Sequence, residues 1–250
     1  EGLAHFLEHM LFIGTEKYPE VDYLSDYVTQ HGGSYNAFTS TDHTQYFFSV
    51  KPDYFLQSLD VFNEFFISPL LSLEYVDREK HAVHAEFKMH EQGDAWRQYH
   101  VSNITANPNN PSSRFTIGNL STLKDQDGLS LHQAVMAFYQ QHYSADKMHF
   151  VAVTPHDLSE VREAILAKLN NIPKRKTKVE PKLPPRFTKK ELAHEVNVRS
   201  LKNIRQLSLQ FPLPSQIESY QYPSAAYVAS LIGFEGPGSL FYNLKFLLPH

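Results

Sequence analysis

A short stretch near the N-terminus, His5-Phe-Leu-Glu8-His9, constrains this chain more than any other feature. In a helix, residues four apart lie about 40° apart around the axis, so both histidines face one side and can chelate a single ion. Glu8 lies about 60° to the other side of His5, where a base could take a proton from water beside the ion. Two histidines alone are more often ordinary helix residues, so the metal hypothesis requires a third ligand.

A second cluster further along the chain offers that ligand. Glu79 and Glu86 are seven residues apart in a stretch with helical periodicity, on a stripe that is otherwise apolar at positions such as Val83. Both carboxylates therefore point toward the core, where a buried charge needs a partner. His81 and His84 lie roughly 140° to 200° around the helix from Glu79, so we expect them to face solvent and not to bind the ion.

The composition narrows the kinds of ligand and partner. The chain has no cysteine, so a transition metal must be held by histidine and carboxylate. A net charge of −4, from 23 basic and 27 acidic residues, provides no positive field for nucleic acid. We expect a soluble segment, because no apolar run is long enough to span a membrane. The compartment stays open between cytoplasmic, periplasmic and secreted.

Periodicity and capping residues predict an α+β fold. The expected helices cover residues 3–13, 23–30, 53–67, 72–92, 94–106, 129–141, 157–172 and 224–232, with a final helix after a turn at 235–238. The expected strands cover residues 34–40, 44–50, 148–153 and 203–211. Prolines and basic residues make 173–190 a linker, which separates a first domain over 1–172 from the beginning of a second over 191–250.

The separation of the two clusters along the chain is a further feature of the sequence. Glu86 follows His9 after 76 intervening residues, positions 10 to 85, and this spacing behind a His-x-x-Glu-His motif resembles the pitrilysin and insulin-degrading enzyme family of inverzincin metallopeptidases (M16). Further stretches resemble the family in the same order along the chain, namely residues 33–40, 78–80, 94–97, 115–119 and 235–240. The sequence after Lys245 departs from the family pattern, which leaves the true C-terminal sequence open.

The resemblance implies a mixed sheet with helices packed on one side, as in mitochondrial processing peptidase, followed by the start of a second, similar domain. It also implies that His5, His9 and Glu86 bind one Zn²⁺ per chain, that Glu8 is the general base, and that Glu79 supports the site. The chain would then belong to a zinc metalloendopeptidase that cleaves peptides and small unfolded proteins with a zinc-bound water. The N-terminal strands and the C-terminal half of the enzyme would be missing, so the isolated fragment could be inactive.

Two alternatives stay open beside this reading. One is a catalytically incomplete member of the family that binds peptides or serves as a scaffold, which the intact Glu8 argues against. The other is a structural zinc site, which would be expected to close its fourth coordination position with protein.

The resemblance further implies a surface for peptide substrates. Residues 36–40 would form an edge strand on which a peptide adds a strand, so that Asn36, Ala37 and Phe38 contact it. The other residues expected to contact substrate are Phe12, Trp96 and Tyr99 around apolar pockets, and Glu235 and Gly236 near the N-terminal end of the peptide. Any one of these aromatic residues could equally be ordinary core, because the chain is 13% aromatic.

Overall fold

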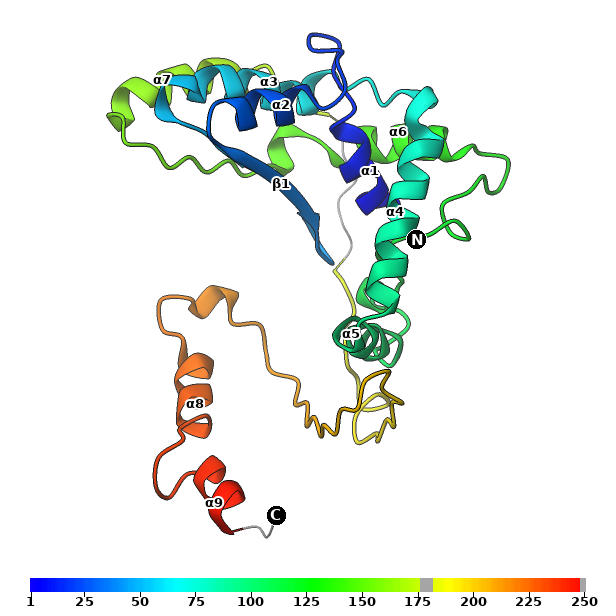
Figure 1. The fold of residues 1–250 in the computed structure, drawn as a ribbon, viewed down its shortest axis with the longest axis vertical. Coiled ribbons are helices and arrows are strands. Elements are labelled where there is room, and N and C mark those ends of the chain that lie inside the picture. The colour runs from blue at the N-terminus through cyan, green and yellow to red at the C-terminus, as the bar shows by residue number, and fades with distance from the viewer. Residues whose placement is uncertain (176–181, 248–250) are drawn as a thin grey trace. The chain divides into compact units, whose positions relative to one another are not determined.

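A computed structural model describes residues 1–175 and 182–247, and helices dominate it (Figure 1). The first elements are α1 (Leu3–Leu11), α2 (Tyr23–Gln30), β1 (Ser34–Thr39), β2 (Thr44–Ser49), α3 (Phe55–Ile67), α4 (Val76–Glu91) and α5 (Asp94–Ile104). The later elements are α6 (Leu131–His142), α7 (Leu158–Leu169), α8 (Ser224–Ile232) and α9 (Leu240–Leu247). The predicted α+β class is confirmed, with two strands among the described residues.

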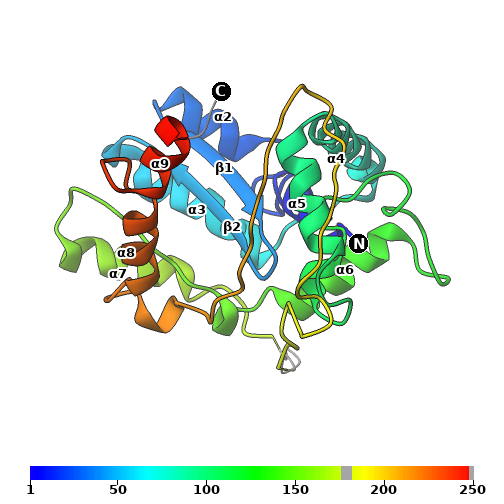
Figure 2. The same cartoon turned by 90° about the horizontal axis from the view of Figure 1, so that it is seen from below.

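The hairpin of β1 and β2 places the only paired strands of the described chain beside α1 and α2 (Figure 2). Phe38 lies opposite Gln45, and the N–H of Ser40 donates to the carbonyl of His43 at 2.8 Å where the hairpin closes. Hydrogen-bonded and non-hydrogen-bonded pairs alternate along an antiparallel ladder. The main-chain N–H and C=O of Phe38 therefore hydrogen-bond to β2, whereas the N–H and C=O of Ala37 point to the open edge of β1.

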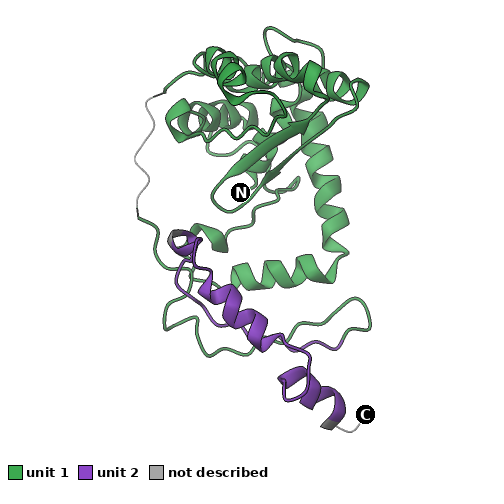
Figure 3. Cartoon of the chain, turned by 90° about the vertical axis from the view of Figure 1, so that its left-hand side faces the viewer, with its two compact units in different colours: residues 1–204 green, residues 205–250 purple. Residues whose placement is uncertain are grey.

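The chain forms two compact units, residues 1–204 and residues 205–250 (Figure 3). The second unit contains α8 and α9. Within the first unit, the carbonyls of Pro184 and Pro185 accept hydrogen bonds from the side chains of Asn110 and Asn107, so this part of the expected linker is anchored near the end of α5. The division into residues 1–172, 173–190 and 191–250 stays a prediction, and residues 176–181 of its linker lie outside the described residues.

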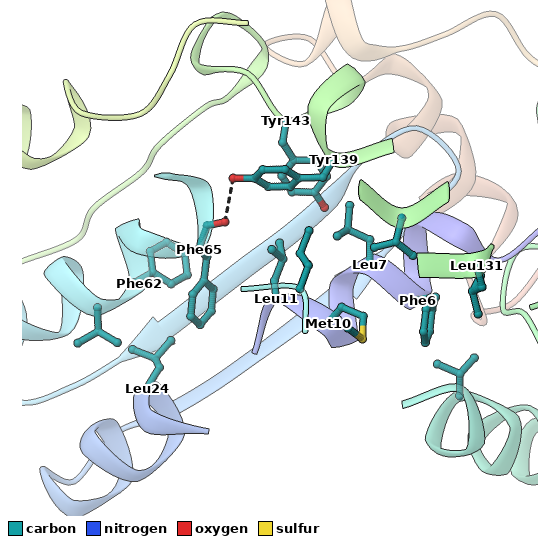
Figure 4. Close-up of a cluster of buried hydrophobic side chains, with 14 of the residues drawn as sticks. Phe6, Leu7, Met10, Leu11, Leu24, Phe62, Phe65, Leu131, Tyr139 and Tyr143 are labelled. Carbon is teal, nitrogen blue, oxygen red and sulfur yellow. Dashed lines mark hydrogen bonds between the residues drawn. The ribbon is translucent and has the colours of Figure 1, made fainter. Parts of the chain in front are cut away.

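The core of the first unit surrounds α1 (Figure 4). Phe6, Leu7, Met10 and Leu11 are fully buried, and they pack with side chains from α2, α3, α4 and α6. Burying a large apolar side chain stabilises a fold by about 1.5–3 kcal/mol, so these four residues hold α1 firmly in place. The histidines on the remaining face of α1 are therefore presented by a rigid helix.

The helix ends show where capping was predicted correctly and where it was not. Asp157 caps α7 through the N–H of Ser159, as predicted. The predicted caps Asp53, Ser72 and Asp94 are wrong. Asp53 lies inside a 3₁₀ turn and Ser72 directly precedes one, so α3 begins one residue later, and α4 three residues later, than a cap at these positions would require. The carboxylate of Asp94 instead accepts from the main-chain N–H groups of residues 201 and 202.

Two predicted strands are absent from the structure. Residues 148–153 and 203–211 have β-type alternation but no assigned strand. A strand needs a neighbour to satisfy its backbone groups, and neither segment pairs with another strand among the described residues. Val151 and Val153 are accordingly 84% and 95% exposed.

Among the described residues, no helix is both long enough and apolar enough to cross a bilayer.

Candidate metal centre

The helix α1 presents the His5-x-x-Glu8-His9 motif because its opposite face is buried in the core. His5 and His9 lie on the side that faces α4, with their ring centroids 4.9 Å apart. Glu8 is 6% exposed, which is rare for a carboxylate. The helical spacing inferred from sequence is therefore the spacing observed, and the structure brings both rings to one side.

The helix α4 carries the two glutamates to the same place. Val83, which is fully buried, anchors the inner face of α4, and Glu79 and Glu86 lie one helical repeat to either side of it. Glu79 is 8% exposed, and Glu86 is half-buried. Figure 1 shows α4 running alongside α1 and ending near α5. Glu79 and Glu86 are seven residues apart in α4 and so lie about two helical turns apart along it.

The three side chains His5, His9 and Glu86 converge on one point. The Nε2 atoms of His5 and His9 lie 3.4 Å and 3.6 Å from Oε2 of Glu86. One ligand atom from each residue falls within 4.8 Å of the other two, and among the described residues this is the group of side chains that could hold a metal ion. Two imidazoles and one carboxylate are a donor set that suits zinc, and they leave coordination positions open.

Each histidine is held at its other ring nitrogen. Nδ1 of His5 donates to the carbonyl of Ile117 at 2.7 Å, so Nε2 is the ring nitrogen that faces Glu86. Nδ1 of His9 lies 3.4 Å from Oε2 of Glu79, and the other oxygen of Glu79 accepts from Nε of Arg78 at 2.7 Å. Outer contacts of this kind fix the ring orientation and the tautomer in metal sites.

A close approach of two glycines supports the contact between His5 and Ile117. Gly2 and Gly118 have φ of 82° and 91°. A Cβ added to Gly2 would lie 2.3 Å from the Cα of Gly118, so only glycine fits there. The segment that carries the Ile117 carbonyl is thereby pressed against the start of α1.

Glu8 is separate from this group and has a partner of its own. The hydroxyl of Thr39, at the end of β1, donates to Oε2 of Glu8 at 2.5 Å and is itself 3.1 Å from the hydroxyl of Thr44 on β2. The other oxygen of Glu8 is left for a further partner. Burial raises the pKa of Glu8, an effect that the Thr39 hydrogen bond and the nearby histidines partly offset.

The electrostatics of the site favour a cation. Burial lowers the pKa of His9, but its contacts with Glu79 and Glu86 outweigh burial and raise the pKa to about 9. The pKa of His5 is also raised, because contact with Glu86 and the Ile117 carbonyl outweighs burial. Hydrogen bonds from His5 and His9 hold the pKa of Glu86 well below its usual range. These carboxylates stabilise positive charge on the imidazoles, and a divalent ion could take the place of those protons.

The site opens into a cleft of about 920 Å³. Its walls include six of the residues expected to contact substrate, namely Phe12, Asn36, Ala37, Phe38, Trp96 and Tyr99. Phe38, Trp96 and Tyr99 are 41–43% exposed, so they are not simply core residues. Glu235 and Gly236 belong to the second compact unit, and their expected contact with substrate stays a prediction.

His81 and His84, which were expected to face solvent, do not join the three converging side chains. His81 is exposed, as expected, and its Nδ1 donates to the carbonyl of Asp77. The expectation that His84 faces solvent is wrong, because the ring is half-buried against Phe87 and its Nδ1 has no hydrogen-bond partner. Packing of the loop that carries Phe115 against Phe87 covers this side of α4.

Sequence reasoning missed His90 and Thr39. Nε2 of His90 lies 3.2 Å from Oε1 of Glu86. The signal for His90 was available, because it follows Glu86 by four residues on the same helix. Thr39 had no such signal, since its contact with Glu8 spans 31 residues and depends on how the hairpin docks on α1.

Comparison with known protein families finds two matching regions in the chain. A model of the insulinase family (peptidase family M16) matches residues 1–117, and a model of the inactive domain of M16 peptidases matches residues 130–246. The solved structure of pitrilysin superimposes with a TM-score of 0.72 at 36% identity, over 76% of this chain and 20% of that one. The predicted fold class is confirmed by these matches.

Full-length relatives resemble the chain from end to end. The candidate zinc protease mug138 of Schizosaccharomyces pombe is 39% identical over 98% of this chain, and the human insulin-degrading enzyme is 35% identical over 98% of it. This chain spans only 26% and 24% of the length of those two proteins. The predicted resemblance is confirmed, and the chain belongs to the pitrilysin and insulin-degrading enzyme family of M16 peptidases.

Proposed function

We propose that this chain is the metal-binding catalytic portion of a zinc metalloendopeptidase. In this proposal His5, His9 and Glu86 bind one Zn²⁺, and Glu8 is the general base. The observation that carries it is the convergence of three ligand atoms within 4.8 Å of one another, beside a buried carboxylate that is not one of them. Three protein ligands with an open position are typical of catalytic zinc, whereas structural zinc is usually closed by four.

The protein residues divide the work of hydrolysis. When bound, a zinc ion polarises the carbonyl to be attacked and acidifies water. Glu8 accepts the proton of the attacking water at its carboxylate and can pass it to the leaving amine. The contact between Thr39 and Glu8 keeps that carboxylate beside the ligands. Glu79 holds His9 in the orientation that directs Nε2 toward the metal.

The cleft suggests how a peptide would be held. The outward C=O of Ala37 on β1 can accept from the main chain of an extended peptide, and its N–H can donate to the peptide once the peptide displaces the side chain of Asn36 from it. Asn36 accepts from the N–H of Ala37 through its Oδ1 at 2.9 Å, so its amide lies on the same edge. The exposed rings of Phe38, Trp96 and Tyr99 offer apolar surface to peptide side chains. Peptides and small unfolded proteins are therefore the proposed substrates.

The remainder of the enzyme is part of the proposal. Because the chain spans about a quarter of the relatives' length, we propose that the rest of a longer polypeptide closes the cleft and completes the site. We expect the isolated chain to bind zinc but to cleave peptides slowly or not at all.

Two substitutions test the assigned roles. Glu86→Gln should weaken zinc binding, because it removes the anionic ligand that offsets the charge of the ion. Glu8→Gln should keep zinc but lower kcat by about 10² to 10⁴, because an amide cannot accept the proton. Metal analysis and cleavage of a quenched fluorescent peptide are measured on the same sample of the full-length enzyme. Glu91→Gln, an exposed change on α4, is the matched control.

Each outcome bears on a different role. Unchanged zinc affinity in Glu86→Gln would remove Glu86 from the ligand set and make Glu79 the next candidate. Loss of zinc in Glu8→Gln would make Glu8 a ligand, and near-parental cleavage with full zinc would show that it is not the base.

A further inference from the structure

The two carboxylate oxygens of Glu86 have different partners. Oε2 faces Nε2 of His5 and of His9, at 3.4 Å and 3.6 Å. Oε1 faces Nε2 of His90, at 3.2 Å. His90 lies one helical turn beyond Glu86 in α4, so backbone geometry alone brings the two side chains together.

The chemistry of the two groups fixes the direction of this contact. An ionised carboxylate has no proton to donate, so Nε2 of His90 must carry the hydrogen and donate it to Oε1. Histidine donating to a carboxylate makes a stronger hydrogen bond than a pair of neutral groups does. Oε1 is therefore occupied, and Oε2 alone is directed at the two imidazoles of α1.

His90 is itself restrained from a second helix. Its ring centroid lies 4.0 Å from that of Trp96 on α5, with the planes tilted by 38°. Trp96 in turn makes an edge contact with Tyr99, at 6.0 Å. The His90 side chain is 18% exposed, so it is enclosed between Glu86 and the aromatic wall of the cleft.

We infer that His90 is a positioning residue for Glu86. It holds Oε1 so that Glu86 offers a single oxygen to the metal, and this leaves coordination positions for water and substrate. The inference rests on the proposed function, since it takes Glu86 as a metal ligand. It also links the metal centre to the cleft, because the ring that holds Glu86 packs on Trp96.

A direct role for His90 as a metal ligand fits the geometry less well. The group of ligand atoms that lie within 4.8 Å of one another contains His5, His9 and Glu86 and does not contain His90. Nε2 of His90 faces the far oxygen of Glu86 and would have to give up that hydrogen bond to reach an ion shared with the other imidazoles.

Three variants separate the hydrogen bond from the ring contact. His90→Phe keeps an aromatic ring against Trp96 but has no donor. His90→Gln loses the ring but keeps a side-chain N–H that can donate to Oε1 of Glu86, as Nε2 of His90 does. His81→Phe makes the same change at an exposed histidine of the same helix and is the matched control. Circular dichroism confirms that each variant is folded.

Metal binding gives the readout without requiring catalysis. Zn²⁺ affinity is measured by competition with a chromogenic chelator, and Co²⁺ is used to record the visible absorption spectrum. Loss of an outer partner of a metal ligand typically costs 10- to 100-fold in affinity, and we expect His90→Phe to fall in that range. We also expect it to shift the Co²⁺ bands. His90→Gln should recover most of the affinity, and His81→Phe should match the parent.

The possible failures are distinct. Parental affinity and spectrum in His90→Phe would overturn the inference and leave the proposed zinc site standing. Equal losses in His90→Phe and His90→Gln would also overturn it, because they would assign the effect to direct ligation by the imidazole, and a loss confined to His90→Gln would overturn it by assigning the effect to the ring contact. If the parent chain and all variants bound no Zn²⁺, the proposed function itself would fail, and the inference with it.

Discussion

Each carboxylate of the candidate metal centre has one oxygen assigned to a supporting residue. Thr39 donates to Oε2 of Glu8, and His90 donates to Oε1 of Glu86. Glu79 accepts from Arg78 at one oxygen and faces His9 with the other. A carboxylate held at one oxygen cannot rotate freely, so its second oxygen is already aimed before substrate or metal arrives. Such preorganisation is where a large part of enzymatic rate enhancement comes from.

The contact of Thr39 with Glu8 leads to a prediction for catalysis. Thr39→Val has nearly the same shape but cannot donate, so Glu8 loses its fixed orientation. In the full-length enzyme we expect kcat to fall by about tenfold, a small part of the 10² to 10⁴ that a general base contributes. KM and zinc content should change little, because Thr39 contacts neither ligand nor metal. Steady-state cleavage of a fluorescent peptide measures this.

Thr39→Ser is the control for that prediction, because it keeps the hydroxyl. Near-parental kcat in Thr39→Val, or equal losses in both variants, would mean that the hydrogen bond does not position Glu8.

The converging residues could be predicted from sequence, and some of their supports could not. Helical spacing predicted that His5 and His9 share one face, and that Glu79 and Glu86 point inward. The supporting contacts of Ile117 and Thr39 depend on how loops and strands dock, which local spacing does not encode. Which residue has which role in catalysis stays a prediction.

At the scale of elements, the hairpin has one edge that is available to a partner. Ala37→Pro removes the outward N–H of that edge, which donates to Oδ1 of Asn36 in the free chain, without removing a ladder bond to β2. We expect the free energy of peptide binding to become less favourable by the contribution of one main-chain hydrogen bond, about 0.5–1.5 kcal/mol. Fluorescence anisotropy with a labelled peptide measures the loss, and zinc content should be unchanged.

Two comparison variants sharpen the test of this edge. Ala37→Ser keeps the N–H and should bind as the parent does. Phe38→Pro removes an inward N–H and should unfold the hairpin, so it would lower thermal stability as well as affinity. Equal peptide affinity in Ala37→Pro and the parent would exclude this edge as the docking strand.

Elements with local signals were predicted well. The bounds of α2 and α8 agree with the predicted ranges, because apolar periodicity and flanking glycine or proline define both. The strands predicted at residues 148–153 and 203–211 are wrong, since β-type alternation marks a segment that can pair but does not supply its neighbour. Caps were predicted too early where a 3₁₀ turn precedes the helix.

At the scale of the whole first unit, Asp60 on α3 connects three segments. Its carboxylate accepts from Nζ of Lys17 and the hydroxyl of Tyr18, both at 2.5 Å, and from Nζ of Lys168 on α7 at 2.6 Å. Burial raises the pKa of Asp60, but these three hydrogen bonds outweigh it and hold the pKa well below its usual range. No pattern in the sequence predicts this connection, because its partners lie 42 to 108 residues away.

The lowered pKa of Asp60 predicts how stability depends on pH. A carboxyl whose folded pKa is depressed stabilises the fold above its unfolded pKa of about 3.9, and this contribution is lost as the pH falls toward the folded pKa. Asp60→Asn should therefore lower the free energy of unfolding at pH 7 by roughly 1–3 kcal/mol, and the difference from the parent should shrink below about pH 4. Urea unfolding at pH 7 and pH 3 measures both values.

The control for this prediction is Asp53→Asn, which removes the same charge from an exposed site. A constant difference between Asp60→Asn and the parent at both pH values would show that ionisation of Asp60 does not stabilise the fold.

The ligand atoms at the candidate metal centre come from two helices, α1 and α4, that are distant in sequence. An ion bound there would close a loop of 76 residues, positions 10 to 85. A permanent bridge across such a loop lowers the entropy of the unfolded chain and thereby stabilises the fold by a free energy on the order of 4 kcal/mol at 25 °C. A metal ion that binds only the folded chain also stabilises the fold. A metal ion at this site would therefore stabilise the fold of this unit in addition to any chemistry that it supplies.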